Sequence, residues 1–164
     1  MTSYGGTGPC TDPTFGPCCG TVYSLTPPSS AGGDCSEAVL YSFPSQAEAQ
    51  TGLAVGEHGV LYGTTDLGGT SNQGTVFSLT PAAVPGGEWT ETTLYSFADS
   101  AAVGASPSGL TIGHGNVLYR ATVIGGTSNQ GVVFSLAPPS FPGEQWTETV
   151  LHDFTGFPRD PGEW

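Results

Sequence analysis

One stretch of 24 residues occurs three times in the chain, and this repetition constrains the fold more than any other feature. The copies are GTVYSLTPPSSAGGDCSEAVLYSF at 20–43, GTVFSLTPAAVPGGEWTETTLYSF at 74–97 and GVVFSLAPPSFPGEQWTETVLHDF at 131–154, with offsets of 54 and 57 residues. A second unit occurs twice, at 52–74 and 109–131, and ends in GGTSNQG both times. A fixed period of this size is typical of a repeat architecture.

The composition favours a turn-rich β protein. The chain has 26 Gly and 14 Pro, and its apolar residues fall in short alternating runs. No window has sustained helical periodicity, and no apolar run approaches the roughly 18 residues of a membrane span. Fourteen acidic residues face two basic ones, a net charge of −12 that repels phosphate backbones and anionic lipid. We therefore expect no nucleic-acid or membrane partner, whereas cations are natural counterparts; acidity alone also keeps a Gly-rich protein soluble.

The four cysteines indicate an oxidising compartment. Cys10, Cys18, Cys19 and Cys35 are disulfide candidates in the first quarter of the chain, which favours an extracellular or cell-surface location, although Met1 is followed by no apolar signal segment here. Four cysteines allow three pairings. Loop closure favours Cys10 with Cys18 or Cys19, so that Cys35 pairs with the remaining cysteine or stays free. A zinc site is disfavoured because no histidine falls at ligand spacing.

One full unit reads as four short strands. Residues 53–55 and 60–65 are apolar or β-branched runs around a tight turn at 57–59, and the 24-residue stretch alternates like a hairpin. Four antiparallel strands in about 55 residues form one sheet, and a sheet repeated radially is a propeller blade. The predicted fold is all-β, built of β-propeller-type repeats of four-stranded antiparallel blades.

The repeat boundaries predict one domain and an oligomer. We expect a single repeat domain over 1–164, with a partial blade carrying the Cys-rich loop at 1–50, blades at 51–107 and 108–156, and the start of a further unit at 157–164. This makes about 2.75 blades, whereas a propeller ring needs roughly four to eight. Because open sheet edges favour association, we expect a homodimer or a higher closed oligomer, with the last segment completing a partner's first blade.

The combined motif resembles a known repeat family. GL-x-V, a short turn, LYGTT-x-x-GG, G-x-VFSLTP and W-x-ET-x-LYSF are similar to the GloVer tandem repeats of large bacterial secreted or surface proteins, from Ser3 to Phe154. The resemblance implies propeller-like sheets and supplies no established activity. The chain departs from the motif where Arg120-Ala121 replaces Gly-Thr, where His152-Asp153 replaces Tyr-Ser, and where Cys35 replaces tryptophan.

Polar side chains gather at one rim of the expected blades. With residues 53–55 innermost and the Trp-led strand outermost, the loop after the outer strand and the GGTSNQG loop reach the same rim. The polar residues there are Asp66, Asn72, Asp99, Ser106, Ser108, Asn129, Asp153 and Asp160. Clustered oxygen ligands in an acidic protein suit Ca²⁺. The competing interpretation is that these side chains hydrogen-bond their own turns.

A Ca²⁺-assisted hydrolase is the first functional hypothesis. The ion would polarise the carbonyl of an ester or lactone, such as an N-acyl homoserine lactone, and activate a water while a rim carboxylate accepts the proton. The catalytic candidates are Asp66, Asp99 and Asp153, and the metal candidates are Asp66, Asp99 and Asp160. The hypothesis is an analogy to propeller lactonases. Their metal-binding turn, P-N-G or P-D-G, is approached here only by Asp160-Pro161-Gly162.

A non-catalytic surface, glycan-binding or structural module is the alternative. The binding candidates are Asn72, Asn129, Ser108, Trp89 and Trp146. A tryptophan that recurs at the same position in two of the three copies either anchors packing or stacks on a ligand. The histidines add little, since His58 and His114 fall in turns and His152 replaces a tyrosine. No nucleophile elbow, H-E-x-x-H helix or phosphate loop is present.

Overall fold

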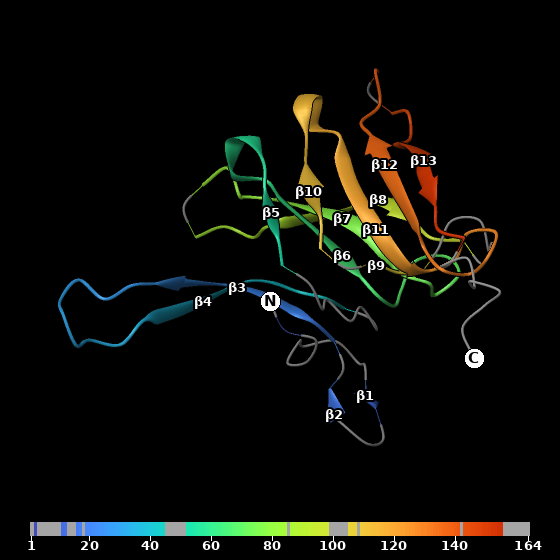
Figure 1. Cartoon of the computed structure of the whole chain (residues 1–164). Coiled ribbons are helices and arrows are strands. Elements are labelled where there is room, and N and C mark those ends of the chain that lie inside the picture. The colour runs from blue at the N-terminus through green and yellow to red at the C-terminus, as the bar shows by residue number, and fades with distance from the viewer. Residues whose placement is uncertain are drawn as a thin grey trace.

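The computed structural model describes residues 2, 11–12, 16–17, 19–44, 52–84, 86–98, 105–107, 109–141 and 143–155, with backbone alone for 11–12, 16–17, 105–107 and 123. Within these ranges the chain forms antiparallel strands and two short 3₁₀ turns (Figure 1), so the all-β prediction is confirmed. None of the helical turns in these ranges is long and apolar enough to cross a membrane.

Three sheets follow one another along the chain. Sheet I is the hairpin of β3 (Thr21–Thr26) and β4 (Ser36–Ser42). Sheet II has the order β5 (Ala54–Val55), β6 (Leu61–Thr65), β7 (Thr75–Thr80) and β8 (Thr90–Ser96). Sheet III has the order β10 (Thr111–Ile112), β11 (Leu118–Ile124), β12 (Val132–Ala137) and β13 (Thr147–Asp153). In addition, β9 (Ala105–Pro107) pairs with β11, and β1 (Thr11–Asp12) pairs with β2 (Gly16–Pro17).

The three copies of the 24-residue stretch fold alike. Each forms a hairpin whose register shifts at the same place, between Val22 and Tyr23 in sheet I and at the matching residues of sheets II and III. The hairpin is closed by the backbone N–H of a phenylalanine, which donates to a glycine carbonyl at 3.0 Å in every copy. These pairs are Phe43 with Gly20, Phe97 with Gly74, and Phe154 with Gly131. A bulge at a fixed place gives each outer strand the same local twist.

A glycine is required where the GGTSNQG loop enters the hairpin. Gly74 has φ 97°, and a Cβ there would lie 2.2 Å from the carbonyl oxygen of Thr65. Only glycine accepts this conformation without strain. The short turns at 57–59 and 114–116 also contain residues with a left-handed backbone conformation, His58 (φ 54°) in sheet II and Gly115 (φ 69°) in sheet III.

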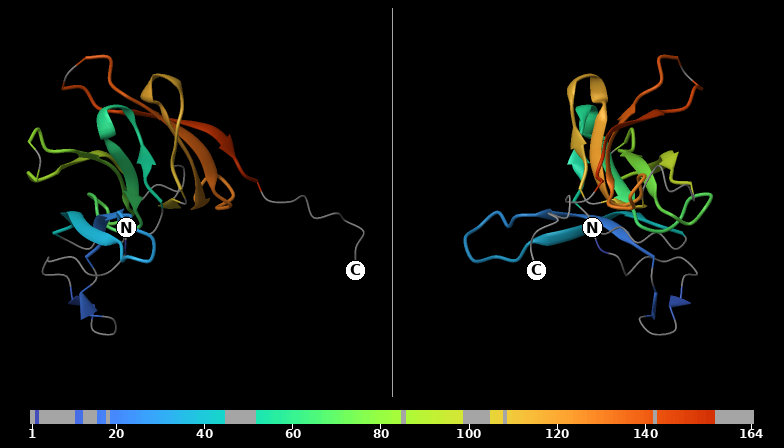
Figure 2. Two further views of the ribbon diagram at one scale, coloured as in Figure 1. Left: turned by 90° about the vertical axis from the view of Figure 1, so that its left-hand side faces the viewer. Right: turned by 45° about the vertical axis from the view of Figure 1, so that its right-hand side comes forward.

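Each sheet packs on the next through an edge-to-face pair of phenylalanines. Phe43 of sheet I meets Phe77 of sheet II with ring centroids 5.1 Å apart, and Phe97 of sheet II meets Phe134 of sheet III at 5.6 Å. One buried cluster therefore joins sheets I and II and another joins sheets II and III. Figure 2 shows the resulting row of sheets. The hydrophobic core therefore consists of side chains buried between neighbouring sheets.

Candidate functional site

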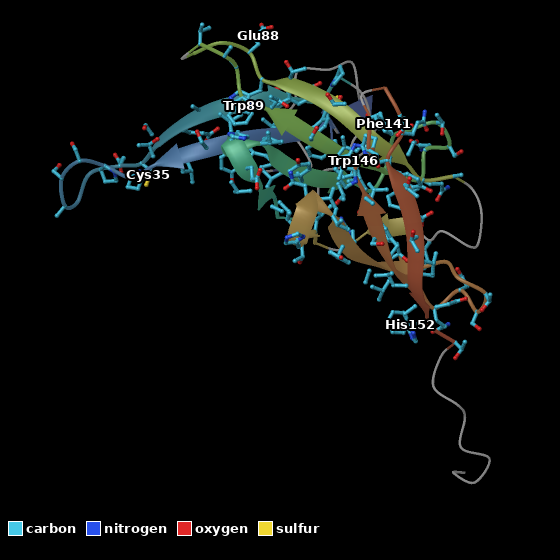
Figure 3. The ribbon with its side chains drawn as sticks, turned by 90° about the horizontal axis from the view of Figure 1, so that it is seen from above. Cys35, Glu88, Trp89, Phe141, Trp146 and His152 are labelled. Carbon is cyan, nitrogen blue, oxygen red and sulfur yellow. The ribbon has the colours of Figure 1, made fainter. Side chains whose placement is uncertain are left out.

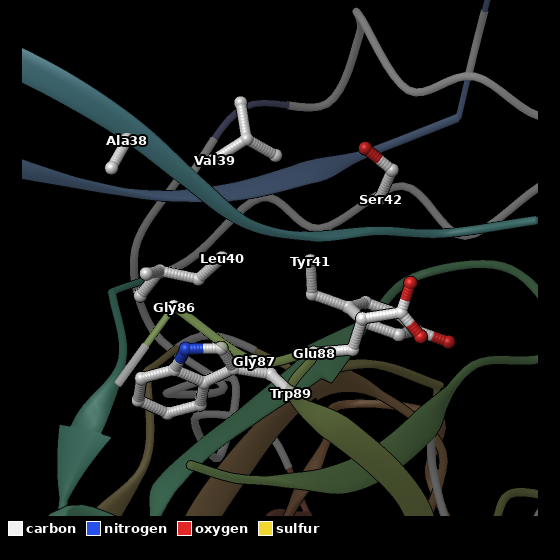
Figure 4. A pocket seen from close by; sticks show the side chains of 9 residues that line it. All are labelled: Ala38, Val39, Leu40, Tyr41, Ser42, Gly86, Gly87, Glu88 and Trp89. Carbon is white, nitrogen blue, oxygen red and sulfur yellow. The ribbon is translucent and has the colours of Figure 1, made fainter. Parts of the chain in front are cut away.

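Two equivalent grooves lie between neighbouring sheets. The I–II groove is lined by β4 of sheet I and by the loop before β8 (Figure 4). The II–III groove is lined by β8 of sheet II and by the loop before β13, with Thr70 at its end. The lining segments 38–42 and 86–89 of the first groove correspond to 92–96 and 143–146 of the second. Each groove has a volume of about 590 Å³.

A half-buried tryptophan forms one wall of each groove. Trp89 packs against the cluster that joins sheets I and II, and Figure 4 shows its ring beneath Leu40. Trp146 packs edge-on against Tyr62 of sheet II, with ring centroids 6.5 Å apart. Each tryptophan therefore packs at a sheet boundary and also presents part of its surface to a groove.

A tyrosine and a glutamate face each other across both sheet boundaries. The hydroxyl of Tyr95 donates to Glu148 Oε2 at 3.1 Å. Burial and the nearby Glu148 carboxylate raise the pKa of Tyr95 to about 12. Burial raises the pKa of Glu148, and the hydrogen bond from Tyr95 opposes that shift. In the first boundary, burial and then the charge of Glu91 raise the pKa of Tyr41. The same pair therefore recurs next to each groove.

Asn72 and Asn129 hold their own loops. Both have left-handed backbones, with φ of 55° and 54°. Asn72 Oδ1 accepts from the backbone N–H of Gly68 at 2.9 Å, and Asn129 Oδ1 accepts from that of Gly125 at 3.0 Å. The structure thus gives these two binding candidates a turn-building role, which is the competing interpretation set out from the sequence.

Asp153 also holds a loop. Its Oδ2 accepts from the backbone N–H of Thr127 at 2.9 Å, and this bond lowers the pKa of the carboxyl. The matching residue of sheet II, Ser96, accepts from the backbone N–H of Thr70 at 2.8 Å. The replacement of serine by aspartate therefore conserves the loop contact and adds a charge.

Asp66 lies near a buried arginine that the sequence did not single out as functional. Arg120 Nη1 donates to Thr64 Oγ1, which joins sheet III to sheet II. Burial lowers the pKa of Arg120 to about 9, and the charge of Asp66 opposes this shift. Within the described part of the chain, Nε and Nη2 of Arg120 have no hydrogen-bond partner. The sequence offered two indications that Arg120 has a special role: it is one of only two basic residues, and it replaces Gly63 of the preceding repeat.

The remaining candidates are divided between described and undescribed residues. Asp99, Ser108 and Asp160 lie outside the described residues, and so do Cys10 and Cys18. Within the described ranges, no three His, Cys, Asp or Glu residues come close enough to hold a metal ion. Cys19 is fully buried and disulfide-bonded, whereas Cys35 is an exposed free thiol.

The comparisons with known proteins agree with the repeat pattern. A family model described as the Gloeobacter/Verrucomicrobia repeat matches residues 2–162. No curated protein and no solved structure matches the chain.

Proposed function

The chain belongs to the Gloeobacter/Verrucomicrobia repeat family, and from this premise we propose that it is a non-catalytic, extracellular glycan-binding module. Its binding sites are the two grooves between neighbouring sheets, each of which takes a short stretch of sugar. The observation that carries the proposal is that the same groove occurs at both sheet boundaries, with a tryptophan and a tyrosine at the same repeat positions in each lining.

The groove chemistry suits a carbohydrate. A sugar ring has an apolar C–H face that packs on an aromatic ring and hydroxyls that pair with polar groups at the rim. The II–III groove offers Trp146 as the aromatic wall, with Thr92, Thr93 and Gln145 as hydrogen-bonding groups. A net charge of −12 favours neutral or amino sugars over sulfated or uronic acid sugars.

The arrangement of sheets supports the propeller predicted from the sequence. Consecutive sheets pack face to face, and the short first strands of sheets II and III, β5 and β10, lie in contact with each other. Strands that converge on one side while the outer strands separate are expected of blades around an axis. We therefore propose that the sheets are propeller blades with the binding grooves at the outer surface. An extracellular location also suits the disulfide at Cys19.

The Ca²⁺-assisted hydrolase remains a prediction from the sequence. Of its carboxylates in the described ranges, Asp153 accepts a bond from the backbone N–H of Thr127, and Asp66 interacts with Arg120. Its other two carboxylates, Asp99 and Asp160, lie outside those ranges.

A glycan-binding screen tests the proposed function. The wild-type chain should bind neutral or amino-sugar oligosaccharides, and the affinity should then be measured by calorimetry. Trp89→Leu and Trp146→Leu keep apolar volume at the sheet boundary but remove the aromatic surface, so each should weaken binding by about tenfold. The control is Phe141→Leu, an exposed aromatic that lines neither groove. Melting curves identify any variant that fails to fold. Full affinity in the Trp89, Trp146 double variant, or no bound sugar in the screen, would refute the proposal.

A further inference from the structure

The two internal boundaries between sheets use the same repeat positions. We call the side of a sheet that meets the next sheet its leading face. The leading face of sheet I presents the buried Phe43, and that of sheet II presents the buried Phe97. The side that meets the previous sheet is its trailing face, which presents Phe77 in sheet II and Phe134 in sheet III. The contact between faces is therefore one recurring interface, made twice within the chain.

Sheet III has a leading face that no described residue covers. At its positions lie Tyr119, Leu151, His152 and Phe154. Tyr119 is 39% exposed, whereas Tyr62 at the same position of sheet II is buried. Phe154 is 41% exposed, whereas Phe97 is fully buried. The face carries the apolar groups of the internal interface without a partner among the described residues.

The trailing face of sheet I is likewise covered by no described residue. At its positions lie Tyr23, Leu25, Cys35 and Glu37. Leu25 is 56% exposed, whereas its equivalents Leu79 and Leu136 are fully buried. The exposed thiol of Cys35 stands where Trp89 packs in sheet II. Figure 3 shows Cys35 and His152 at opposite ends of a curved row of sheets.

The polar groups on these two faces are also complementary. In the internal boundaries a tyrosine of the leading face meets a glutamate of the trailing face, as in the bond from Tyr95 to Glu148. The corresponding positions on the two outward faces hold His152 and Glu37. The ring of His152 stands edge-on to Phe154 at 4.7 Å and 76°, close to the 5.2 Å and 77° between Tyr95 and Phe97. A histidine would therefore face a glutamate where an internal boundary pairs a tyrosine with a glutamate.

We propose that the leading face of sheet III in one copy of this chain docks on the trailing face of sheet I in a second copy. Phe154 takes the place of Phe97 and packs against Tyr23, while His152 faces Glu37. A second copy is the occupant because one chain carries both halves of an interface that it already makes twice internally, and because His152 of one half and Glu37 of the other stand where an internal boundary pairs a tyrosine with a glutamate. The contact is heterologous, so two copies close a ring if the curvature of the row allows it, and more copies extend it otherwise.

Molar mass measured against concentration tests the docking. By light scattering and sedimentation equilibrium in about 150 mM salt, the wild type should exceed the 16.7 kDa of one chain as its concentration rises. Phe154→Asp and Leu25→Asp should each raise the dissociation constant at least about a hundredfold, because each puts a charge into an apolar contact. Phe141→Asp is the control. Phe141 is 68% exposed, and its equivalent beside an internal boundary, Val84, is still 64% exposed, so this substitution should leave the mass unchanged.

Mixing the two variants separates docking from misfolding. The Phe154→Asp chain keeps its trailing face and the Leu25→Asp chain keeps its leading face, so a mixture should form one-to-one dimers although each variant alone is monomeric. A wild type that stays monomeric at every concentration would overturn the proposal and assign the faces to repeats of another polypeptide. Self-association of either variant with wild-type affinity would also overturn it.

The His152 and Glu37 pair gives a second readout. Within its own copy, His152 lies beside Asp153, pairs with the uncharged Val133 on β12 and contacts Phe154. His152→Tyr, which restores the tyrosine of the other repeats, should therefore keep the dimer, and a loss of association in that variant would contradict the pairing.

Discussion

Phe97 allows the strength of one sheet boundary to be measured. Its ring is fully buried between sheets II and III and stands edge-on to Phe134 at 5.6 Å and to Tyr95 at 5.2 Å. Phe97→Ala removes this apolar contact and leaves a cavity between two sheets. A buried phenylalanine truncated to alanine costs about 3–5 kcal/mol, and the loss of two edge-to-face partners places Phe97 in the upper half of that range.

Phe154→Ala is the matched control, because it is the same substitution at the same repeat position. Phe154 keeps its closing bond to Gly131 but is 41% exposed, so its loss should cost about 1 kcal/mol in the single chain. Both variants should be unfolded in guanidinium, followed by tryptophan fluorescence, at a concentration too low for association. A loss of stability at Phe97 no larger than at Phe154 would refute the view that the boundaries between sheets hold the chain together.

Two further predictions concern alkaline pH and calcium. The pKa of Tyr95 is raised from 10 to about 12, so its contribution to stability should be complete below pH 10 and should be lost as the pH rises toward 12. Tyr95→Phe should therefore flatten that part of the profile of unfolding free energy against pH. A profile identical to that of the wild type would contradict the assignment. If rim oxygens bind Ca²⁺ as the sequence predicts, chelation should lower the melting temperature and added Ca²⁺ should restore it. A melting curve that is unchanged in chelator would remove the ion and, with it, the basis of the hydrolase.

The strands could be predicted because the hairpin sequence occurs three times, so that the same pattern could be compared in three copies. Alternating β-branched and aromatic residues placed β3, β7 and β12, and glycine-rich turns placed the hairpin connections. The register shift after Val22 and its equivalents was not predicted. A bulge changes which residues oppose one another without changing the alternation of either strand, so the pattern carries no sign of it.

The candidate site was harder to predict because identical residue types serve loops and ligands. Asn72 looks like an oxygen ligand in the sequence, yet its side chain accepts from Gly68 four residues away, a bond that depends on the backbone geometry of the loop. Trp89 could be selected because it recurs, but only the packing of neighbouring sheets places it in a groove. Arg120 was passed over because one substitution in a repeat does not show whether the new side chain points inward.

The phenylalanine contacts between sheets make the folding of each unit depend on its neighbours. Among the described sheets, sheet II packs against a neighbour on both sides, through Phe77 toward sheet I and Phe97 toward sheet III. In a linear array of this kind, cooperativity comes from nearest-neighbour coupling, so the interior unit is the last to open and the terminal units fray first. In a chain that is not docked on a second copy, local unfolding would therefore begin at the outward faces of sheets I and III and leave strand β8 ordered longest.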